Sequence, residues 1–419
     1  MLGLALLGAI HPLLRAAPAN SQSDRATTEA LAAIASDPAC QLASLSVLAL
    51  RAGRPLYQAQ FGQRAIAAGL PATADTLYRI ASISKLVTTL GVLRLVEAGT
   101  LALDTDVSSY LGFSLRNPHF ADRAITLRML MTHTSSLRDE GGYSWPLSTS
   151  LASVINPAMW AANAGPGEFF TYCNLGWGVI GTIMEAASGE RFDLLMQRLV
   201  LAPLGVRGGY NLATLGTDNI ATLYRKRTVD TEVWDAAGPW IAQADDVTRP
   251  PSPPAGIETY RPGSNATPFS PTGGLRISAA GLGTIMQMLM AGGVHQGRRL
   301  LQAASVETMF TRQWTYDAQK NNGDTSGGLF TAWGLGNQQF PVRPGSPLVA
   351  GGGFNAVGHL GDAYGLRSLF LFDRASCTGF VALIGGTSTD PDASKGRHSP
   401  LSRVEERILD TLWERTRHA

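Results

Sequence analysis

A serine and a lysine at the start of an apolar segment are the residues of this chain whose types and spacing best suit chemistry. Ser82 and Lys85 lie three positions apart in residues 79–87, RIASISKLV. On a helix, side chains at this spacing share one face, so the hydroxyl and the amine can come within hydrogen-bonding distance. The pair predicts a serine nucleophile with a lysine as its base. A helix-capping serine followed by a surface lysine has the same pattern, so other features must decide.

The residues that follow Lys85 predict surroundings in which a lysine acts as a base. Residues 86–96 are apolar on nearly every side, which predicts a largely buried helix that runs to about Ala98. Burial disfavours a charged amine and lowers its pKa. Only four of the 34 basic residues are lysines, and arginine, the common basic residue here, does not deprotonate. The free N–H groups of the first helical turn would also stabilise an oxyanion beside Ser82.

Five further segments resemble sequence elements of one family, the serine hydrolases that comprise class C beta-lactamases, penicillin-binding DD-peptidases and family VIII esterases. They are residues 101–111 (LALDTDVSSYL), 126–137 (TLRMLMTHTSSL), 166–174 (PGEFFTYCN), 269–282 (FSPTGGLRISAAGL) and 358–361 (GHLG). At these places the family has LxLDDPVSKYL, TIRHLLTHTSGL, PGxxxxYSN, GGLxSTAxDL and, in one of its forms, HxG. The order is that of the family, and the matches run from about Ser44 to the C-terminal end.

The resemblance assigns roles to two residues of the PGEFFTYCN segment. Tyr172 would relay a proton between Ser82, Lys85 and the leaving group, and a nearby ammonium would favour its phenolate form. Asn174 would hydrogen-bond the acyl side of the substrate. Cys173 stands where the family usually has serine.

The GHLG segment supplies the third element of the predicted site. Gly361 has no side chain, so substrate backbone could lie against the strand edge. By family analogy the amide of Asp362 would be a second oxyanion donor beside that of Ser82. His359 would tune the charge near Tyr172. The histidine of the THTSSL segment, His133, is expected to fix a loop rather than to take part in catalysis.

Two departures from the family pattern bear on the substrate. Asp362 puts a carboxylate beside the predicted oxyanion site, where it would repel a substrate carboxylate unless the side chain turns away. His359 stands where many beta-lactamases have the lysine of KTG, a cation that would hold the carboxylate of a beta-lactam. Both departures favour neutral esters or amides and predict little beta-lactamase activity.

The pattern of strands and helices predicts an α/β fold of the α+β type. Residues 42–53 and 55–66 alternate as two strands around a Gly53 turn, and two more strand-like runs lie at 357–373 and 378–386. We expect a beta-lactamase/transpeptidase-like architecture, with an antiparallel sheet built from both termini, flanked by helices and interrupted by an inserted, mainly helical lobe. The predicted boundaries are one domain over 26–419, with an α/β lobe at about 26–95 and 330–419 and a helical lobe at about 96–329.

Two segments within the predicted helical lobe do not have a helical pattern. Residues 249–274 are rich in proline and glycine, so we expect a long loop that forms a rim of the pocket and carries specificity. The basic run 225–227 is expected to be a solvated turn. Residues 176–181 match GxGxxG, but no acidic residue follows at the spacing of a ribose contact, so close helix packing is the better interpretation.

Composition and missing motifs exclude several other functions. The formal net charge of +2 gives no basic field for nucleic acid or an anionic membrane. The three cysteines have no metal-ligand spacing and suggest no disulfide scaffold, so neither metal nor cofactor is predicted. The sequence contains no GxSxG, HExxH or Walker A motif. The oligomeric state is left open.

The N-terminal segment has features of an export signal. Residues 2–14 are apolar but too short to span a bilayer, and an AxA-type cleavage site follows at 17–19. We therefore predict that residues 1–25 are a signal peptide or a disordered leader, with a periplasmic or secreted protein. Because no basic residue precedes the apolar run, a cytoplasmic location stays as the alternative.

Taken together, the sequence predicts a serine hydrolase that acts through an acyl-enzyme on a small ester, amide or peptide. An esterase is the first hypothesis, and a D-amino-acid-specific peptidase, DD-carboxypeptidase or amidase is the alternative. A third possibility is a relative without turnover that binds penicillin or muropeptides, or one that assembles into filaments. The intact Ser82, Lys85, Tyr172 and Gly361 argue against a relative without turnover, but they leave assembly into filaments open.

Overall fold

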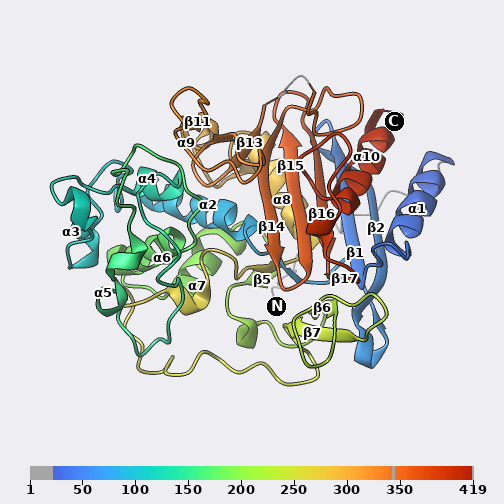
Figure 1. Cartoon of the computed structure of the whole chain (residues 1–419), viewed down its shortest axis with the longest axis horizontal. Helices are drawn as coiled ribbons and strands as arrows, with labels where there is room; N and C mark the ends of the chain where they lie inside the picture. Colours follow the sequence, from blue (N-terminus) through green and yellow to red (C-terminus); the bar gives the residue numbers. More distant parts are fainter. Residues whose placement is uncertain (1–21, 342–344, 418–419) are drawn as a thin grey trace, which may run out of the picture.

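The central sheet is assembled from the two ends of the chain, as the strand-like runs predict. In the computed structural model, which describes residues 22–341 and 345–417, β1 (Ser44–Arg51) lies between β2 (Arg54–Ala65) and β16 (Thr378–Ile384). The nine strands of this sheet pair antiparallel with their neighbours. This arrangement confirms the predicted α+β fold with a sheet built from both termini (Figure 1).

The remaining strands of the large sheet come mostly from the C-terminal part of the chain. They are β3 (Leu70–Pro71), β11 (Trp314–Thr315), β12 (Ala332–Trp333), β13 (Gln338–Phe340), β14 (Ala356–Ala363) and β15 (Leu366–Asp373). The spatial order is β11-β12-β13-β14-β15-β16-β1-β2-β3. Because β13 pairs with β14 only through residues 356–358, the second half of β14 has a free edge on that side.

Smaller sheets lie beside the large one. One contains β4 (Tyr78–Arg79), β5 (Gly208–Gly209) and β8 (Arg276–Ile277); a second contains β6 (Leu223–Lys226), β7 (Trp240–Ala244) and β17 (Gly386–Thr387); a third contains β9 (Val294–His295) and β10 (Arg298–Arg299). The sequence predicts a solvated turn at 225–227, and this is wrong for Arg225 and Lys226, which lie in β6 and pair with β7.

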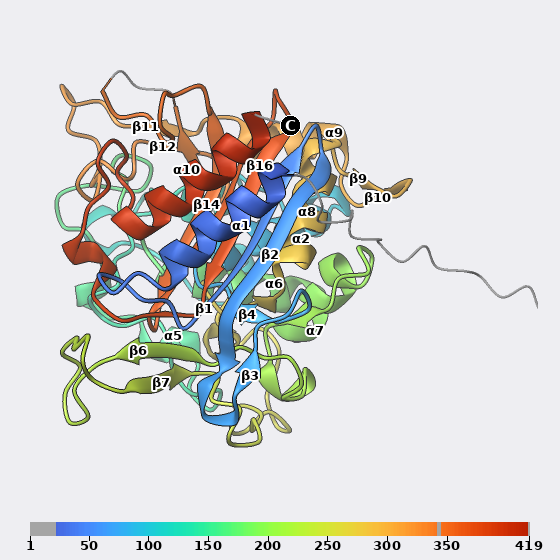
Figure 2. The same ribbon diagram turned by 90° about the vertical axis from the view of Figure 1, so that its right-hand side faces the viewer.

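Helices cover both faces of the sheet, which explains why seven of the eight residues of β1 are buried. Helices α1 (Gln22–Ala35) and α10 (Arg403–Arg417) pack side by side on one face (Figure 2). Helix α8 (Ala279–Met290) packs on the other face against β1 and β16. The lobe boundaries stay predictions, but α8 belongs with the sheet although it falls inside the segment 96–329.

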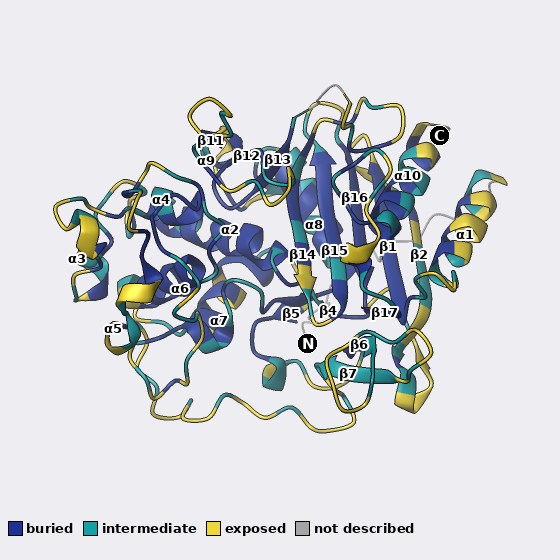
Figure 3. Cartoon of the chain, viewed as in Figure 1, coloured by how far each residue is buried: buried dark blue, intermediate teal, exposed yellow. Residues whose placement is uncertain are grey.

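A group of helices forms the part of the molecule away from the sheet. They are α3 (Ser108–Leu111), α4 (Leu127–Met131), α5 (Leu151–Val154), α6 (Leu175–Ser188) and α7 (Phe192–Met196), while α9 (Ala303–Phe310) lies beside β11 (Figure 1). Helix α2 (Ile83–Glu97) lies between these helices and the sheet, and twelve of its fifteen residues are buried (Figure 3). The predicted apolar helix after Ser82 is therefore confirmed, and its burial on all sides follows from contacts with both α6 and β14.

The glycines of α6 allow a loop to pack closely on the helix. A methyl group at Gly178 would meet Thr267, and one at Gly181 would meet Pro271. This confirms close helix packing as the meaning of the GxGxxG pattern. The loop concerned is the end of the proline-rich segment 249–274, which contains no α-helix and no strand, as predicted.

The N-terminal prediction falls largely outside the described residues. Helix α1 begins at Gln22, so the folded part starts a few residues before the predicted position 26, and the predicted leader lies mainly in residues that the structure does not describe. Among the described helices, none has the length and apolar character needed to cross a bilayer. The three cysteines, Cys40, Cys173 and Cys377, are all free thiols.

Gly361 of β14 lets the sheet approach the start of α2. A methyl group at this position would lie far inside van der Waals contact with the carbonyl oxygen of Ile80 and the hydroxyl of Ser368. The missing side chain thus serves contact between β14 and the residues that precede Ser82. The sequence predicts instead that the free space serves the substrate.

We predict that Gly361→Ala destabilises the protein by about 1–3 kcal/mol, because the new methyl group must push β14 away from Ile80. Gly176→Ala in α6 is the matched control. There the methyl group would meet Leu130 at an ordinary 3.6 Å, and alanine is the better helix former. Thermal unfolding of both variants measures the effect, and a Gly361→Ala variant as stable as Gly176→Ala would contradict it.

Candidate active site

One large cleft contains the residues that the sequence singles out. It has a volume of about 1460 Å³ and lies along the free edge of β14. Ser82, Tyr172, Asn174, His359, Gly361 and Asp362 all line it. Lys85 lies directly beneath, fully buried. The structure therefore brings all seven predicted site residues together, while their individual roles stay predictions.

Ser82 begins α2 in a turn that is unusual for a non-glycine residue. Ala81, directly before it, has a φ of 46°, a left-handed conformation that is rare for alanine. Such strain occurs most often at functional sites, where the surrounding structure holds it in place. The Ser82 N–H has no acceptor among the described residues, so it is available to an oxyanion.

The Lys85 amine is surrounded by three oxygen atoms. Its Nζ lies 2.9 Å from the Ser82 hydroxyl, 2.9 Å from Asn174 Oδ1 and 3.0 Å from the Thr272 carbonyl. Oδ1 and the carbonyl only accept hydrogen bonds, so they take two N–H groups of the amine. The remaining hydrogen-bonding position of the Lys85 nitrogen faces Ser82 Oγ. An ammonium donates to Oγ there, whereas a neutral amine accepts the hydroxyl proton.

Burial brings the two protonation states of Lys85 close in free energy. Desolvation, partly opposed by the charge of Asp139, lowers the pKa of Lys85 to about 7. A substantial fraction of the amine is therefore neutral near pH 7. The sequence predicts this direction from the apolar helix, and the structure gives the same direction and the same cause.

Asp139 holds Asn174 in place and is the main site residue that sequence reasoning missed. Its carboxylate accepts hydrogen bonds of 2.9 Å from the Asn174 backbone and side-chain N–H groups and from the Leu175 N–H. A carboxylate at the first turn of a helix also satisfies free N–H groups there. The Asn174 amide is thereby oriented with Oδ1 toward Lys85.

Asn174 has a different set of contacts from the one that the resemblance implies. Oδ1 accepts from Lys85 and, at 2.7 Å, from the Thr272 hydroxyl, while the amide nitrogen donates to Asp139. Oδ1 is thus engaged by protein groups, whereas one of the two N–H groups of the amide forms no hydrogen bond among the described residues and can donate to a substrate in the cleft. Thr272, a second residue missed from the sequence, has no signal beyond its place in the FSPTGGL segment.

Tyr172 stays protonated, contrary to the expected phenolate. Burial, only partly offset by hydrogen bonding with Ser82, raises the pKa of Tyr172 above its usual value. Lys85 lies 4.8 Å from the centre of the ring, so the ammonium faces the aromatic ring rather than the phenol oxygen. The expectation of a favoured phenolate is therefore wrong, because burial outweighs the nearby charge.

His133 fixes the loop that carries Tyr172. Its Nδ1 accepts a 3.0 Å hydrogen bond from the Cys173 N–H, and its ring stacks on Tyr172 with centroids 4.5 Å apart. Burial holds the pKa of His133 well below its usual range. These contacts agree with the structural role expected for this residue.

His359 is a neutral residue of the cleft wall. Burial, followed by the charge of Lys85, lowers its pKa to about 3. Its ring lies edge-on to Trp333 at 5.4 Å and tilted to Tyr172 at 6.3 Å. A neutral imidazole adds no positive charge near Tyr172, so the expected tuning of charge is not available from this residue.

The Asp362 side chain points away from the serine. Because alternate residues of a strand face opposite sides, Asp362 and the close-packed Gly361 lie on different faces of β14. Its carboxylate lies 3.4 Å from Arg367, its partner across the strands, and is 56% exposed. Its carboxylate still lines the cleft, and its charge is one of those that raise the pKa of Tyr172.

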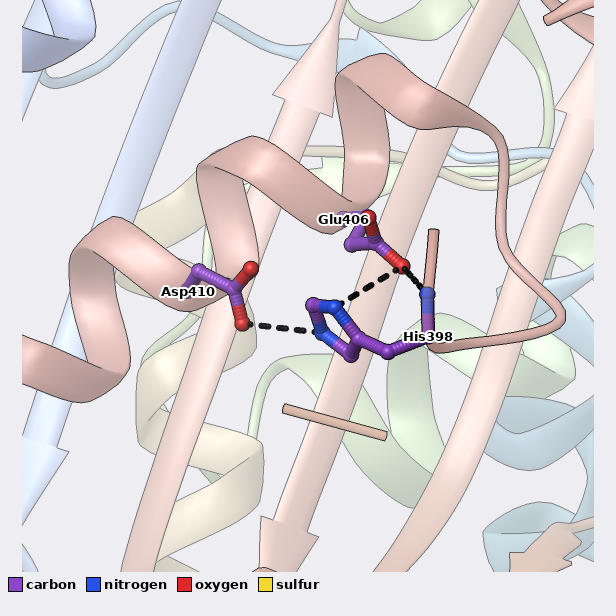
Figure 4. A group of neighbouring side chains, drawn as sticks. All are labelled: His398, Glu406 and Asp410. Carbon is purple, nitrogen blue, oxygen red and sulfur yellow. Dashed lines mark hydrogen bonds and ion pairs between the residues drawn. The ribbon is translucent and has the colours of Figure 1, made fainter. Parts of the chain in front are cut away.

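A separate group of possible metal ligands lies outside the cleft. His398, Glu406 and Asp410 gather where the C-terminal helix meets the preceding loop (Figure 4). Glu406 already accepts from the N–H groups of Arg397, His398 and Ser399. Burial acts to raise its pKa, but these hydrogen bonds lower it to about 2. Glu406 thus ties the loop to α10, and its lone pairs are occupied.

Comparison with known proteins agrees with this geometry. The beta-lactamase family model matches residues 24–403, and the chain belongs to this family. Protein Rv1367c of Mycobacterium tuberculosis is 29% identical over 332 residues, which cover 73% of this chain and 77% of that protein. Esterase EstB of Burkholderia gladioli is 32% identical over 186 residues, which cover 40% of this chain and 46% of the esterase.

Solved structures share the fold. A penicillin-binding protein homologue from Pyrococcus abyssi has a TM-score of 0.67 and 22% identity, over 93% of this chain and 77% of that one. A D-amino acid amidase from Ochrobactrum anthropi SV3 has a TM-score of 0.65 and 20% identity, over 94% of this chain and 99% of the amidase. At these identities the likeness establishes the fold, which confirms the beta-lactamase/transpeptidase-like architecture.

We predict that the Lys85 amine titrates near pH 7, well below the usual lysine value of about 10.4. Only four lysines need to be resolved, so NMR of protein labelled at lysine Cε can follow each one. Asp139→Asn removes a charge that raises the pKa of Lys85, so its titration should move to lower pH. Titration of Lys85 above pH 10 would contradict the account.

Proposed function

We propose that the protein is a serine hydrolase that acts through an acyl-enzyme on carboxylic esters, with Ser82 as nucleophile. The observation that carries this proposal is the contact of Ser82 Oγ with a buried lysine whose pKa lies near 7. Nucleophilic catalysis by serine needs a base within hydrogen-bonding distance and with a pKa near the working pH. Lys85 meets both conditions.

The acylation step follows from the hydrogen bonds of the free protein. Ser82 Oγ attacks the substrate carbonyl carbon, its proton passes to the neutral Lys85 amine, and the carbonyl oxygen becomes an oxyanion. The N–H of Ser82 and, by family analogy, that of Asp362 would hold this oxyanion. When the carbonyl re-forms, the bond to the leaving group breaks and the acyl group stays on Ser82.

Tyr172 is the proposed proton donor to the leaving group. Because burial keeps the phenol protonated, it can give a proton to the departing oxygen or nitrogen and recover one from the Lys85 ammonium. Water then attacks the acyl-enzyme, with the same groups used in reverse, and releases the acid. Asn174 and Asp139 are positioning residues in this scheme, since they orient the amine through Asn174 Oδ1.

The cleft favours neutral leaving groups, which supports an esterase with little beta-lactamase activity. The wall beside Tyr172 consists of aromatic rings and of His359, which stays neutral because its pKa is about 3. These side chains bring no cation that would hold a carboxylate on the leaving-group side. EstB, by its name, is an esterase.

A D-amino-acid-specific peptidase or amidase is the second candidate. Its support is the D-amino acid amidase fold and the name of a further relative, the D-alanyl-D-alanine-carboxypeptidase/endopeptidase AmpH of Escherichia coli, which is 31% identical over 141 residues. These residues cover 32% of this chain and 36% of AmpH. Tyr172 could protonate either an amine or an alkoxide leaving group, so its presence does not separate the esterase from the peptidase or amidase. A panel of ester, peptide and amide substrates does.

We predict that the protein hydrolyses para-nitrophenyl esters of short acids and that Ser82→Ala lowers kcat/KM by at least about a thousandfold, because the nucleophile is lost. The panel also contains a D-alanyl peptide, a D-amino acid amide and a chromogenic cephalosporin, on which we expect slower turnover. A faster reaction with the peptide or the amide would favour the second candidate.

Ser84→Ala is the matched control for the serine substitution. Ser84 lies two residues further along α2, but its hydroxyl accepts from the Leu275 N–H and does not contact Lys85. We expect this variant to keep its esterase activity. Equal rates of the wild type and Ser82→Ala on every compound would remove the proposed nucleophile.

A further inference from the structure

Arg79 lines the same cleft and is the one cation of its lining that forms no ion pair among the described residues. The other three have acidic partners: Arg225 with Glu232 at 4.0 Å, Arg367 with Asp392 at 2.6 Å and with Asp362 at 3.4 Å, and Lys395 with Asp392 at 3.7 Å. A half-buried guanidinium in the wall of a cleft is costly without an anion. Its role therefore needs an explanation.

Asp245 is the carboxylate whose charge acts on Arg79, but it already forms an ion pair with another arginine. Arg276 donates to both of its oxygens, at 2.9 and 2.6 Å, and both side chains are buried. Burial and then the charge of Arg276 lower the pKa of Arg79, while Asp245 raises it. Asp245 therefore neutralises the charge of Arg276. The charge of Arg79, which lines the cleft, has no carboxylate of its own among the described residues.

Two contacts hold Arg79 in place without using its terminal nitrogens. Nε–H donates to the Gly273 carbonyl at 3.1 Å, and the guanidinium carbon lies 5.0 Å from the centre of the Tyr364 ring. No hydrogen bond of the two Nη groups is found within the described residues. A fixed guanidinium with free Nη groups is well suited to bind a carboxylate through two parallel hydrogen bonds.

Tyr364 is held in a strained conformation beside Arg79. It forms the two-residue turn between β14 and β15 together with Gly365, and both have positive φ, 58° and 84°. Asparagine or glycine is the usual residue at such a position. Tyr364 in this conformation lines the cleft with Arg79, and the residue is 43% exposed.

The position of Arg79 relative to the nucleophile follows from two neighbouring carbonyl groups. Lys85 donates to the Thr272 carbonyl and Arg79 to the next one, that of Gly273. The two side chains thus contact consecutive peptide groups of one segment. Tyr172 contacts the same amine through its ring, whose centre lies 4.8 Å from Nζ. Arg79, Tyr364 and Tyr172 all line the cleft that contains Ser82.

We propose that Arg79 and Tyr364 form a carboxylate subsite for the acyl part of the substrate. The preferred substrates are then esters whose acyl chain carries a terminal carboxylate, such as hemiesters of dicarboxylic acids. This rests on the proposed function, in which Tyr172 gives a proton to the leaving group, so the acyl chain is assigned to the part of the cleft that Arg79 lines. The side of Tyr172 is neutral and aromatic, whereas the side of Arg79 has the unmatched charge.

The test compares two esters of equal chain length, para-nitrophenyl hemiadipate and para-nitrophenyl hexanoate, after subtraction of the rate in buffer. The wild type should have the higher kcat/KM for the hemiadipate. In Arg79→Met the ratio of the two kcat/KM values should fall at least about tenfold, since a hydrogen-bonded charge pair is lost. Arg79→Lys keeps the charge but not the two-pronged geometry, so its ratio should fall less.

Arg54→Met is the control, because Arg54 is an exposed arginine of β2, and its ratio should equal that of the wild type. A purely structural role of Arg79 would lower the melting temperature and both rates together, leaving the ratio unchanged, and this result would overturn the proposal. If Arg79→Met does not fold, inhibition of the wild type provides the test. Adipate should inhibit hydrolysis of the hexanoate ester more strongly than hexanoate does. Equal inhibition by the two acids would refute the subsite.

These outcomes are separate from the failure of the proposed function. If Ser82→Ala hydrolyses both esters as fast as the wild type, the serine mechanism is wrong whatever the ratio is. If hydrolysis depends on Ser82 but the wild type prefers the hexanoate ester, only the carboxylate subsite is wrong.

Discussion

The site depends on the number of hydrogen-bond acceptors around one buried amine. Two carbonyl oxygens, from Asn174 and Thr272, occupy two N–H groups of Lys85, and the third direction faces the Ser82 hydroxyl. At this amine, the proton whose position is left open is therefore the one shared by the serine and the lysine. Burial brings the charged and neutral amine close in free energy, so a small change at the substrate carbonyl can decide where this proton lies.

Several elements far apart in the sequence serve this one arrangement. Helix α2 buries the amine, and Asp139 fixes Asn174 at the start of α6. The glycines of α6 allow the loop that contains Thr272 to pack closely against this helix. Gly361 brings β14 against the residues before Ser82. Each contact is a matter of close packing or of a satisfied hydrogen bond, and none requires a charge exposed to solvent.

The sequence alone predicts the parts of this account that depend on local patterns. The helix after Ser82 and the lowered pKa of Lys85 follow from one apolar segment, and the sheet built from both termini follows from alternation at the two ends. Asp139 and Thr272 could not be predicted, because their contacts join segments that are far apart in the chain. The protonated state of Tyr172 also escaped prediction, since the balance between burial and a nearby charge depends on depth in the fold.

The orientation of Asp362 shows the same limit on a smaller scale. Its identity predicts a repulsive charge near the oxyanion, but the register of β14 and β15 turns its side chain toward Arg367. A shift of one residue in this register would reverse the result. Register depends on long-range pairing, which the residues around Asp362 do not reveal.

The most direct test of the account is covalent labelling of Ser82 by a fluorophosphonate, followed by mass spectrometry of intact protein and of its peptides. We predict a single adduct on Ser82, a labelling rate that rises with pH through about 7 as Lys85 loses its proton, and almost no labelling of Lys85→Met. An adduct on another residue, or an equal rate in Lys85→Met, would contradict the claim that the neutral lysine activates this serine.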